Sequence, residues 1–314
     1  MSPLDCLSAA SPILPPQVHV FVRDWLSSNN VLLKSPAGHV LIDSGYARHA
    51  SLTLALLSSA RGLGEQPLAL LVNTHCHSDH MGGNAAVKAR YGCPIAVPVG
   101  EAPVIDAWEE QTLLLGYTDQ HAPRFAYDET IRPGETLSWG DLEWRAVAAP
   151  GHDMGALVFF NDAHGILVSG DALWQNGYGL VMPREVDPRA LPAARATLET
   201  LASLDARIVI PGHGEPFTDV AAALERAFSR TDAFDADSLR VARHVLKVLL
   251  VFALLDRRRL ALADLPAYME RVEIYRQFNA LFFRRPPGKL ADMLVDELLR
   301  AGAVKREAAW LMPA

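Results

Sequence analysis

LLVNTHCHSDHMGGN, residues 70–84, places His75, His77, Asp79 and His80 within six positions, directly after an apolar run. That run, LALLVN, indicates a buried strand, so the cluster lies where the strand ends. Four potential ligands in so short a stretch would carry a large desolvation cost if they were buried without a metal. The stretch therefore predicts a metal site at the end of a strand.

Three further candidate ligands follow strand-like runs elsewhere in the chain. His152 follows LEWRAVAAPG, Asp171 follows GILVSG and His213 follows RIVIPG. Because α/β folds place their ligands at the carboxyl ends of strands, we expect these side chains to meet the first cluster. The full set exceeds the needs of one tetrahedral ion and predicts two divalent metals that share a bridging carboxylate. Zinc is the favoured metal, and iron and manganese are alternatives.

The rest of the first 234 residues alternates between strand-like and helix-like patterns, which predicts a layered α/β fold with helices outside sheets. Helices are expected at 51–62, 84–92 and 190–203, and strands at 18–25, 29–46 (a hairpin turning at SPAG), 68–73, 94–98, 142–150, 156–160, 165–171 and 207–213. Two runs of strands thus flank an irregular middle, residues 101–130, which we interpret as a flap over the site.

From about residue 235 the pattern changes to apolar residues at helical spacing, as in DADSLRVARHVLKVLLVFALLD. We therefore predict two domains, a metal-binding catalytic domain at 1–234 and a small helical domain at 235–314. The final stretch, KLADMLVDELLRAGAVKREAAWLMPA, resembles a winged-helix element, with a helix, a glycine turn at Gly302 and a closing hairpin.

Composition narrows the class of protein. Residues 235–314 hold 14 Lys and Arg against 10 Asp and Glu, whereas the remainder holds 15 against 26, and this acidic body argues against nucleic-acid binding. No apolar run reaches the roughly 20 residues of a membrane helix, and the N-terminal stretch lacks the features of a secretory signal. Three scattered cysteines, Cys6, Cys76 and Cys93, favour a reducing compartment. We expect a cytoplasmic protein without membrane contact, and strand alternation is expected to point Cys76 away from the ligands.

The segments THCHSDHMGGN, APGHDMGA, SGDALW and IPGHGEP resemble those of the metallo-β-lactamase fold superfamily, especially its glyoxalase II-like hydrolases. The resemblance covers about residues 17–220 and implies a four-layer αββα sandwich. It implies that Asp171 bridges two metals, the first held by His75, His77 and His152, the second by Asp79, His80 and His213. Asp43, in LIDSG, matches a position that supports the ligands from behind, with an ordinary turn carboxylate as the alternative.

The implied reaction is hydrolysis of a thioester, lactone or related ester-like bond by a metal-bound hydroxide, because two cations lower the pKa of a shared water toward about 7. Asp79 is expected to orient that nucleophile. Zinc β-lactamases of the best-known class carry cysteine where Asp171 stands, so antibiotic hydrolysis is not expected as the main activity. Two alternatives remain, a phosphodiesterase or ribonuclease of the same fold and a mono-iron oxidoreductase similar to persulfide dioxygenases.

Substrate identity is the least determined feature. Trp174, Tyr178 and Met182 follow Asp171 closely and are candidates for the pocket wall. The expected partner is a small molecule, and the sequence does not set the oligomeric state, with a homodimer as one option. Some basic residues of the C-terminal region could contact phosphates, although a solvated surface is the preferred interpretation; they are Arg257 to Arg259, Arg284, Arg285 and Lys289.

Overall fold

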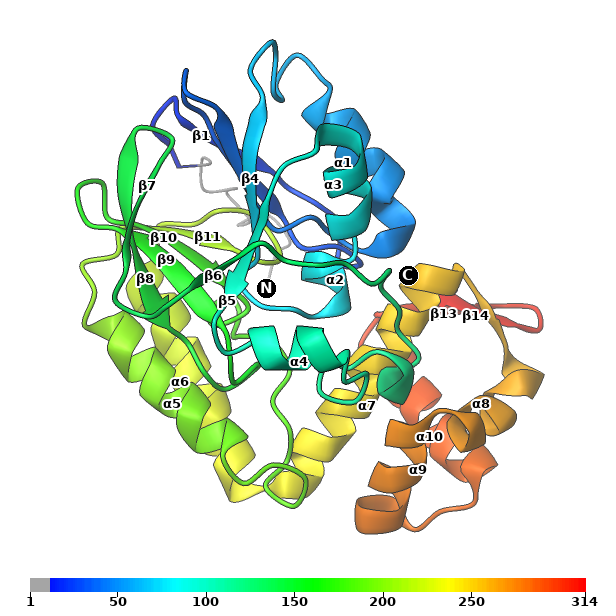
Figure 1. The fold of residues 1–314 in the computed structure, drawn as a ribbon. Coiled ribbons are helices and arrows are strands. Elements are labelled where there is room, and N and C mark those ends of the chain that lie inside the picture. The colour runs from blue at the N-terminus through cyan, green and yellow to red at the C-terminus, as the bar shows by residue number, and fades with distance from the viewer. Residues whose placement is uncertain (1–11) are drawn as a thin grey trace, which may run out of the picture.

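Two mixed β-sheets face each other at the centre of the fold (Figure 1). The structure is a computed structural model that describes residues 12–314, so Cys6 and the start of the first predicted domain lie outside the described residues. The first sheet runs in chain order: β1 (Val18–Phe21), β2 (Asn30–Leu33), β3 (His39–Ile42), β4 (Leu68–Val72), β5 (Ile95–Pro98), β6 (Glu129–Ile131). The second has the order β11 (Ile208–Pro211), β10 (Ile166–Gly170), β9 (Leu157–Asn161), β8 (Leu142–Ala148), β7 (Thr136–Trp139).

Helices cover the outer face of each sheet. In Figure 1, α1 (Ala50–Leu57) and α3 (Asn84–Tyr91) lie outside the first sheet, and α5 (Ala190–Ala202) and α6 (Val220–Ala236) lie outside the second. This is the αββα sandwich that the sequence predicts, and the expected hairpin between β2 and β3 is confirmed. The first helix ends at Leu57 and not at Gly62, because residues 58–66 form a series of turns.

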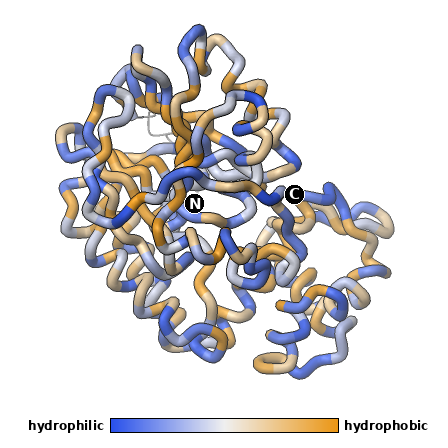
Figure 2. Tube along the Cα trace, viewed as in Figure 1, coloured by the Kyte–Doolittle hydropathy of each residue, from blue (hydrophilic) through white to orange (hydrophobic). Residues whose placement is uncertain are grey.

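One apolar core lies between the two sheets. Trp144, Phe159 and Ile42 are completely buried there, and the apolar colour of the strands in Figure 2 is concentrated in these inner layers. Strands such as β9 and β10 are buried along their whole length, because one face meets the other sheet and the other face meets helices. Burying each large apolar side chain contributes about 1.5–3 kcal/mol, which fixes the strands that carry the candidate ligands.

Strand direction brings five loops to one edge of the sandwich. β3 runs parallel to β4, and β10 runs parallel to β11. β8 has the same direction as β10, since both are antiparallel to β9. The segments that follow β4, β8, β10 and β11 carry the candidate ligands, and the segment that follows β3 carries Asp43.

The C-terminal region is helical, as predicted, and ends in a hairpin. Its helices are α7 (Ser238–Arg257), α8 (Leu265–Arg271), α9 (Glu273–Phe278) and α10 (Pro287–Arg300). Gly302, at φ 68°, turns the chain into β13 (Val304–Glu307) and β14 (Trp310–Pro313), and β14 also pairs with β12 (Leu260–Ala261). The predicted boundary after residue 234 falls in the last turn of α6, and one apolar cluster continues across it. An independent fold for residues 235–314 therefore stays a prediction.

The segment between β5 and β6 is less irregular than expected. It contains α4 (Ala102–Ala107) and a short 3₁₀ turn, η2 (Gly116–Thr118). The Tyr117 hydroxyl donates a hydrogen bond to Gln277 of α9, and Asp119 pairs with Arg257 of α7, so this segment is fastened to the C-terminal helices. Among residues 12–314, no helix combines the length and the apolar character needed to cross a bilayer.

Candidate metal centre

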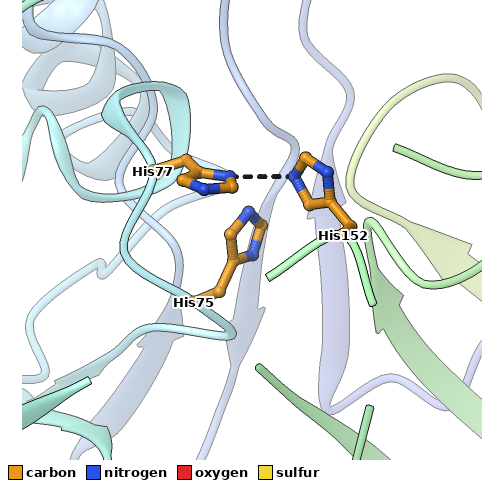
Figure 3. Close-up of side chains that lie close together, drawn as sticks. All are labelled: His75, His77 and His152. Atoms are coloured by element: carbon orange, nitrogen blue, oxygen red, sulfur yellow. Dashed lines mark hydrogen bonds between the residues drawn. The ribbon is translucent and has the colours of Figure 1, made fainter. Parts of the chain in front are cut away.

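Three histidines form the first cluster at the edge of the sandwich. His75 and His77 follow β4, and His152 follows β8 on the facing sheet. Figure 3 shows the three rings turned toward one another, with His77 Nδ1 2.9 Å from His152 Nε2. The ring centroids lie 4.5–5.0 Å apart. One ligand atom from each ring can therefore face a common point, and the three nitrogens lie within 4.8 Å of one another.

A second cluster lies beside the first and contains Asp79, His80, Asp171 and His213. Asp79 and His80 lie in the short helix α2 (Ser78–Met81), which begins directly after His77. His213 Nε2 lies 3.1 Å from Asp79 Oδ2, and His80 Nε2 lies 3.3 Å from Asp171 Oδ1. All four residues are buried or nearly so, and together they present two imidazoles and two carboxylates.

The Asp171 carboxylate lies between the two clusters. Its Oδ1 approaches His80 of the second cluster, whereas its Oδ2 lies 3.4 Å from His152 Nε2 of the first. One oxygen is thus directed to each side. This placement suits a carboxylate that bridges two metals, the role that the family resemblance implies for Asp171.

Hydrogen bonds hold the histidine rings from the nitrogen opposite the cluster. Asp43 Oδ2 lies 2.8 Å from His80 Nδ1 and also accepts a hydrogen bond from the Thr74 hydroxyl. His152 Nδ1 lies 2.5 Å from the Leu180 carbonyl. Such partners fix the ring orientation and the tautomer, as they do around metal-bound histidine. Asp43 therefore occupies the supporting position that the sequence indicated.

The unsatisfied atoms of the clusters fit a cation. His75 Nε2 and His80 Nε2 are buried and have no hydrogen-bond partner among the described residues. Buried polar atoms without partners are costly, and an imidazole nitrogen with a free lone pair is a metal ligand. The buried carboxylates Asp43, Asp79 and Asp171 also require positive charge nearby. These residues fit two divalent ions.

The pKa shifts describe the same electrostatic demand. Burial, followed by neighbouring imidazoles, holds the pKa of His75 well below its usual value and lowers that of His77 to about 4. These rings are thus neutral at pH 7, which is the form that binds metal. Burial opposes ionisation of Asp171, but His80 and His213 outweigh it and keep the pKa of that carboxyl well below its usual value. Burial also opposes the charge on His80, yet Asp43 and Asp171 raise its pKa well above normal, so these carboxylates favour a positive charge at this point, which a metal ion would supply in place of the proton.

Two glycines allow the backbone to approach the candidate ligands this closely. A Cβ at Gly212 would lie 2.3 Å from Asp171 Oδ1, and one at Gly179 would lie 2.7 Å from Cγ of His152. Neither contact is possible without displacing a candidate ligand. The sequence analysis did not identify Gly179, and nothing in its local pattern marks it.

An apolar chamber of about 90 Å³ opens directly onto the clusters. Trp25 stacks on the His213 ring at 5.5 Å, and Trp174 Nε1 donates a hydrogen bond to Asp171 Oδ1. The opposite side of the chamber comes from α7 and from the segment after α4. The lining residues apart from the candidate ligands are Trp25, Leu114, Gln120, Trp174, Leu180, Val248, Leu249 and Phe252.

A wider groove of about 510 Å³ adjoins the chamber and shares His77, Leu114 and His152 with it. Met182 lines this groove and Trp174 lines the chamber, and their role as walls of a substrate pocket stays a prediction. The expectation for Tyr178 is wrong. Its side chain is buried in the core, and its hydroxyl lies 2.8 Å from that of Thr231 on α6, so it is absent from the lining of both cavities.

Several lining residues escaped the sequence analysis, notably Trp25, Val248, Leu249 and Phe252. The last three lie on one side of α7, whose apolar spacing was clear, but spacing alone does not say what a helix covers. Leu114 and Gln120 come from the segment that was interpreted as a flap. Cys76 points away from the ligands into an apolar cluster, as expected.

Comparisons with known proteins place this site in a wider context. The family model described as "Metallo-beta-lactamase superfamily" matches residues 23–213. A hydroxyacylglutathione hydrolase of Bdellovibrio bacteriovorus is 29% identical over 115 residues, which is 36% of this chain and 37% of that protein. The probable metallo-hydrolase YflN of Bacillus subtilis is 26% identical over 60% of this chain and 79% of its own length.

The chain spans only 33–43% of the length of the first curated relatives it matches. Among solved structures, a beta-lactamase domain protein from Burkholderia ambifaria aligns with a TM-score of 0.59 at 22% identity, covering 99% of this chain and 96% of that one. At this identity the likeness shows the fold alone.

Proposed function

Since the chain belongs to the metallo-β-lactamase superfamily, we propose that it is a metal-dependent hydrolase of ester-like bonds whose substrates carry an uncharged, apolar acyl group. One observation carries the proposal. A cluster of three histidines and a His/Asp cluster meet at Asp171, at the floor of a chamber whose remaining walls are mostly apolar. The floor supplies ligands for a reaction centre, and the walls favour an apolar substrate.

Two divalent ions are the proposed cofactors, with zinc favoured because the ligand atoms are imidazole nitrogen and carboxylate oxygen. The first cluster, His75, His77 and His152, would hold one ion. Asp79, His80 and His213 would hold the other, and Asp171 would contact both. When bound, two such ions supply Lewis acidity toward a carbonyl oxygen and lower the pKa of water.

The protein's own groups position the reactants. The pKa of Asp79 is lowered, because His80 and His213 outweigh the effect of burial, so its carboxylate is an acceptor at neutral pH. It can therefore accept a hydrogen bond from an attacking water and orient it. The Trp174 indole fixes Asp171 by donating to Oδ1, and the Trp25 ring limits water access above His213.

The charge of the chamber discriminates among substrates. In the described part of the chain, no lysine or arginine lines the chamber. Arg189 lines the adjoining groove, but it is paired with Asp187. Hydroxyacylglutathione, the thioester in the name of several relatives, carries two carboxylates on its glutathione part, and a phosphodiester is also anionic. Both substrates would need cations near the metal centre. We therefore favour thioesters, lactones and carboxylic esters with apolar acyl groups.

A substrate panel with zinc-reconstituted protein tests this proposal. The panel contains acetyl and hexanoyl thioesters of a neutral thiol, a lactone of a six-carbon hydroxy acid, S-lactoylglutathione and bis(p-nitrophenyl) phosphate. We expect the highest kcat/KM for the hexanoyl esters. Preference for S-lactoylglutathione or for the phosphodiester would contradict the proposed substrate class, and no hydrolysis by protein loaded with two metals would contradict the proposed function.

A further inference from the structure

A second cleft lies on another face of α7, separate from the metal centre. It is a groove of about 770 Å³, formed by α6, by the first half of α7 and by Glu297 of α10. It shares no lining residue with the apolar chamber or the adjoining groove. We call it the basic groove; its lining residues include Arg226, Arg230, Arg240, Arg243 and Lys247.

The basic residues come from the facing sides of two helices. Arg226 and Arg230 are four positions apart on α6, and Arg240, Arg243 and Lys247 are three and four positions apart on α7. Residues at these spacings share one face of a helix. Because these faces of α6 and α7 lie opposite each other, five cationic side chains line one cavity, which contains only two carboxylates, Asp237 and Glu297.

Those two carboxylates are already engaged. Asp237 caps α7 by accepting a hydrogen bond from the Arg240 backbone N–H. Glu297 is shared by Lys247, at 3.0 Å, and Arg243, at 3.6 Å. Glu297 therefore neutralises one of two cations, and Asp237 is committed to the helix end.

The remaining cations have no carboxylate partner. Arg226 and Arg230 donate to the backbone carbonyls of Gln175 and Asn176, which carry no net charge. Within residues 12–314, neither of these arginines nor Arg240 makes an ion pair. Arg243 approaches Glu297 only at 3.6 Å, and its buried Nε atom makes no hydrogen bond to any described residue.

The titration of a neighbouring histidine reflects this excess of positive charge. His244 also lines the basic groove, and its pKa is lowered to about 4, first by burial and then by Arg230, Lys247 and Arg240. The pKa of Arg230 is lowered as well, by burial and by Arg240. An anion in the groove would relieve this repulsion.

We propose that the basic groove binds a small molecule that carries a pyrophosphate group, either free pyrophosphate or a nucleoside diphosphate. Guanidinium groups present several N–H donors in a planar fork that matches phosphate oxygens, and four of the five cations are arginines. The volume lies in the range of small-molecule sites. Phe234 and Leu239, which also line the groove, offer apolar contact to a nucleoside.

Calorimetric titration of the full-length protein with pyrophosphate and with ADP, at 150 mM salt, tests this site. The double variant Arg240→Ala/Arg243→Ala removes two groove cations. The matched control, Arg284→Ala/Arg285→Ala, removes two cations from an exposed turn that does not line the groove. We expect at least a tenfold weaker affinity in the groove variant and an unchanged affinity in the control.

A milder variant guards against loss of fold. The Arg240 side chain makes no ion pair within the described residues, so Arg240→Gln is expected to melt as wild type does and still bind pyrophosphate more weakly. Tighter binding of ADP than of pyrophosphate would identify a nucleotide as the ligand, and equal binding would identify the pyrophosphate charge alone. Equal affinity in the wild type and both groove variants would place the anion elsewhere, for example at the metal centre, and would overturn the proposal, as would the absence of binding at millimolar ligand.

Discussion

The two walls of the apolar chamber at the metal centre differ in chemistry and in origin. The wall on the sandwich side consists of buried imidazoles and carboxylates carried by the segments that follow strands, and His80 and His152 are each held by a hydrogen bond from behind. The opposite wall consists of apolar side chains from α7 and from the segment after α4, among them Leu114, Val248 and Phe252. The first wall sets what reaction is possible, and the second sets which substrate fits.

This difference indicates which wall determines the type of reaction and which determines the substrate preference. Buried polar groups are costly unless they are paired or bind a metal, so the sandwich wall tolerates few substitutions. The α7 wall carries no such constraint, and its apolar residues can change in size without an unpaired charge being left behind. Reaction type should therefore be sensitive to substitutions in one wall, and substrate preference to substitutions in the other.

The largest effect is expected from removing a candidate ligand. His152→Ala takes a nitrogen from the first cluster, and Asp171→Ala takes the carboxylate that both clusters share. Elemental analysis should show near two metals per chain in the wild type, a lower content in His152→Ala and the lowest in Asp171→Ala. Hydrolysis should fall by about 10³-fold or more, since a bound metal supplies several kcal/mol of transition-state stabilisation.

His164→Ala is the matched control for these ligand variants. His164 is exposed in the turn between β9 and β10 and belongs to neither ligand cluster. Its substitution should leave metal content and rate unchanged. A single tightly bound iron in the wild type would contradict the assignment of two metals to this site and would point to oxygen-dependent chemistry instead.

A smaller effect is expected behind the ligands. Asp43→Asn keeps the shape of the side chain but removes the charge that faces His80 Nδ1. Asp43 has φ 59°, a conformation that Asn adopts readily, so the fold should persist. Metal affinity, measured by competition with a chelator, should weaken about 10–100-fold.

Asp141→Asn provides the control for this substitution. Asp141 also has a positive φ, at 57°, and its carboxylate accepts a hydrogen bond from Ser35 away from the metal centre. Equal metal affinity in both Asn variants would mean that Asp43 is only a turn carboxylate.

The sandwich wall was largely predictable from sequence, for a physical reason. Asp171 and His213 each follow an uninterrupted apolar strand, and strand direction alone brings such ends to one edge. The family resemblance added the assignment of ligands to each metal, and the geometry of the Asp171 carboxylate agrees with it.

The α7 wall was not predictable, because it depends on contacts between distant segments. Trp174 and Tyr178 lie four residues apart, yet a tight turn, in which the Trp174 N–H donates to the Gly177 carbonyl, directs only Trp174 to the metal centre. Tyr178 packs against α6 instead. Similarly, the periodicity of α7 marks it as amphipathic, but the basic groove exists only because α6 presents two arginines to it.

Substrate preference should respond to the α7 wall. Phe252 lines the chamber and packs edge-on against Tyr46 at 5.3 Å. Phe252→Ala should lower kcat/KM for a hexanoyl ester about tenfold relative to the acetyl ester, with metal content unchanged, because the longer acyl group loses its apolar contact. Leu281→Ala, at an exposed leucine of the C-terminal region, is the control. Parallel losses for both esters would remove Phe252 from substrate selection.

The smallest effect concerns stability and lies on the groove face of α7. The folded-state pKa of His244, about 4, lies below the value of about 6.5 expected in the unfolded chain. Between these values the unfolded state binds a proton that the folded state does not, so this group lowers stability as the pH falls from 6.5 toward 4. At pH 5.5 the loss relative to pH 7.5 is about 1 kcal/mol.

His244→Gln cannot titrate, so its free energy of unfolding should fall by about 1 kcal/mol less than that of the wild type between pH 7.5 and 5.5. Urea unfolding at the two pH values measures this difference and cancels the contributions of the other histidines. Parallel pH profiles would mean that the ring is protonated in the folded state despite its cationic neighbours. Repeating the unfolding measurements on the wild type with pyrophosphate then tests the basic groove, since an anion that offsets Arg230 and Arg240 should raise the pKa of His244 and flatten the profile.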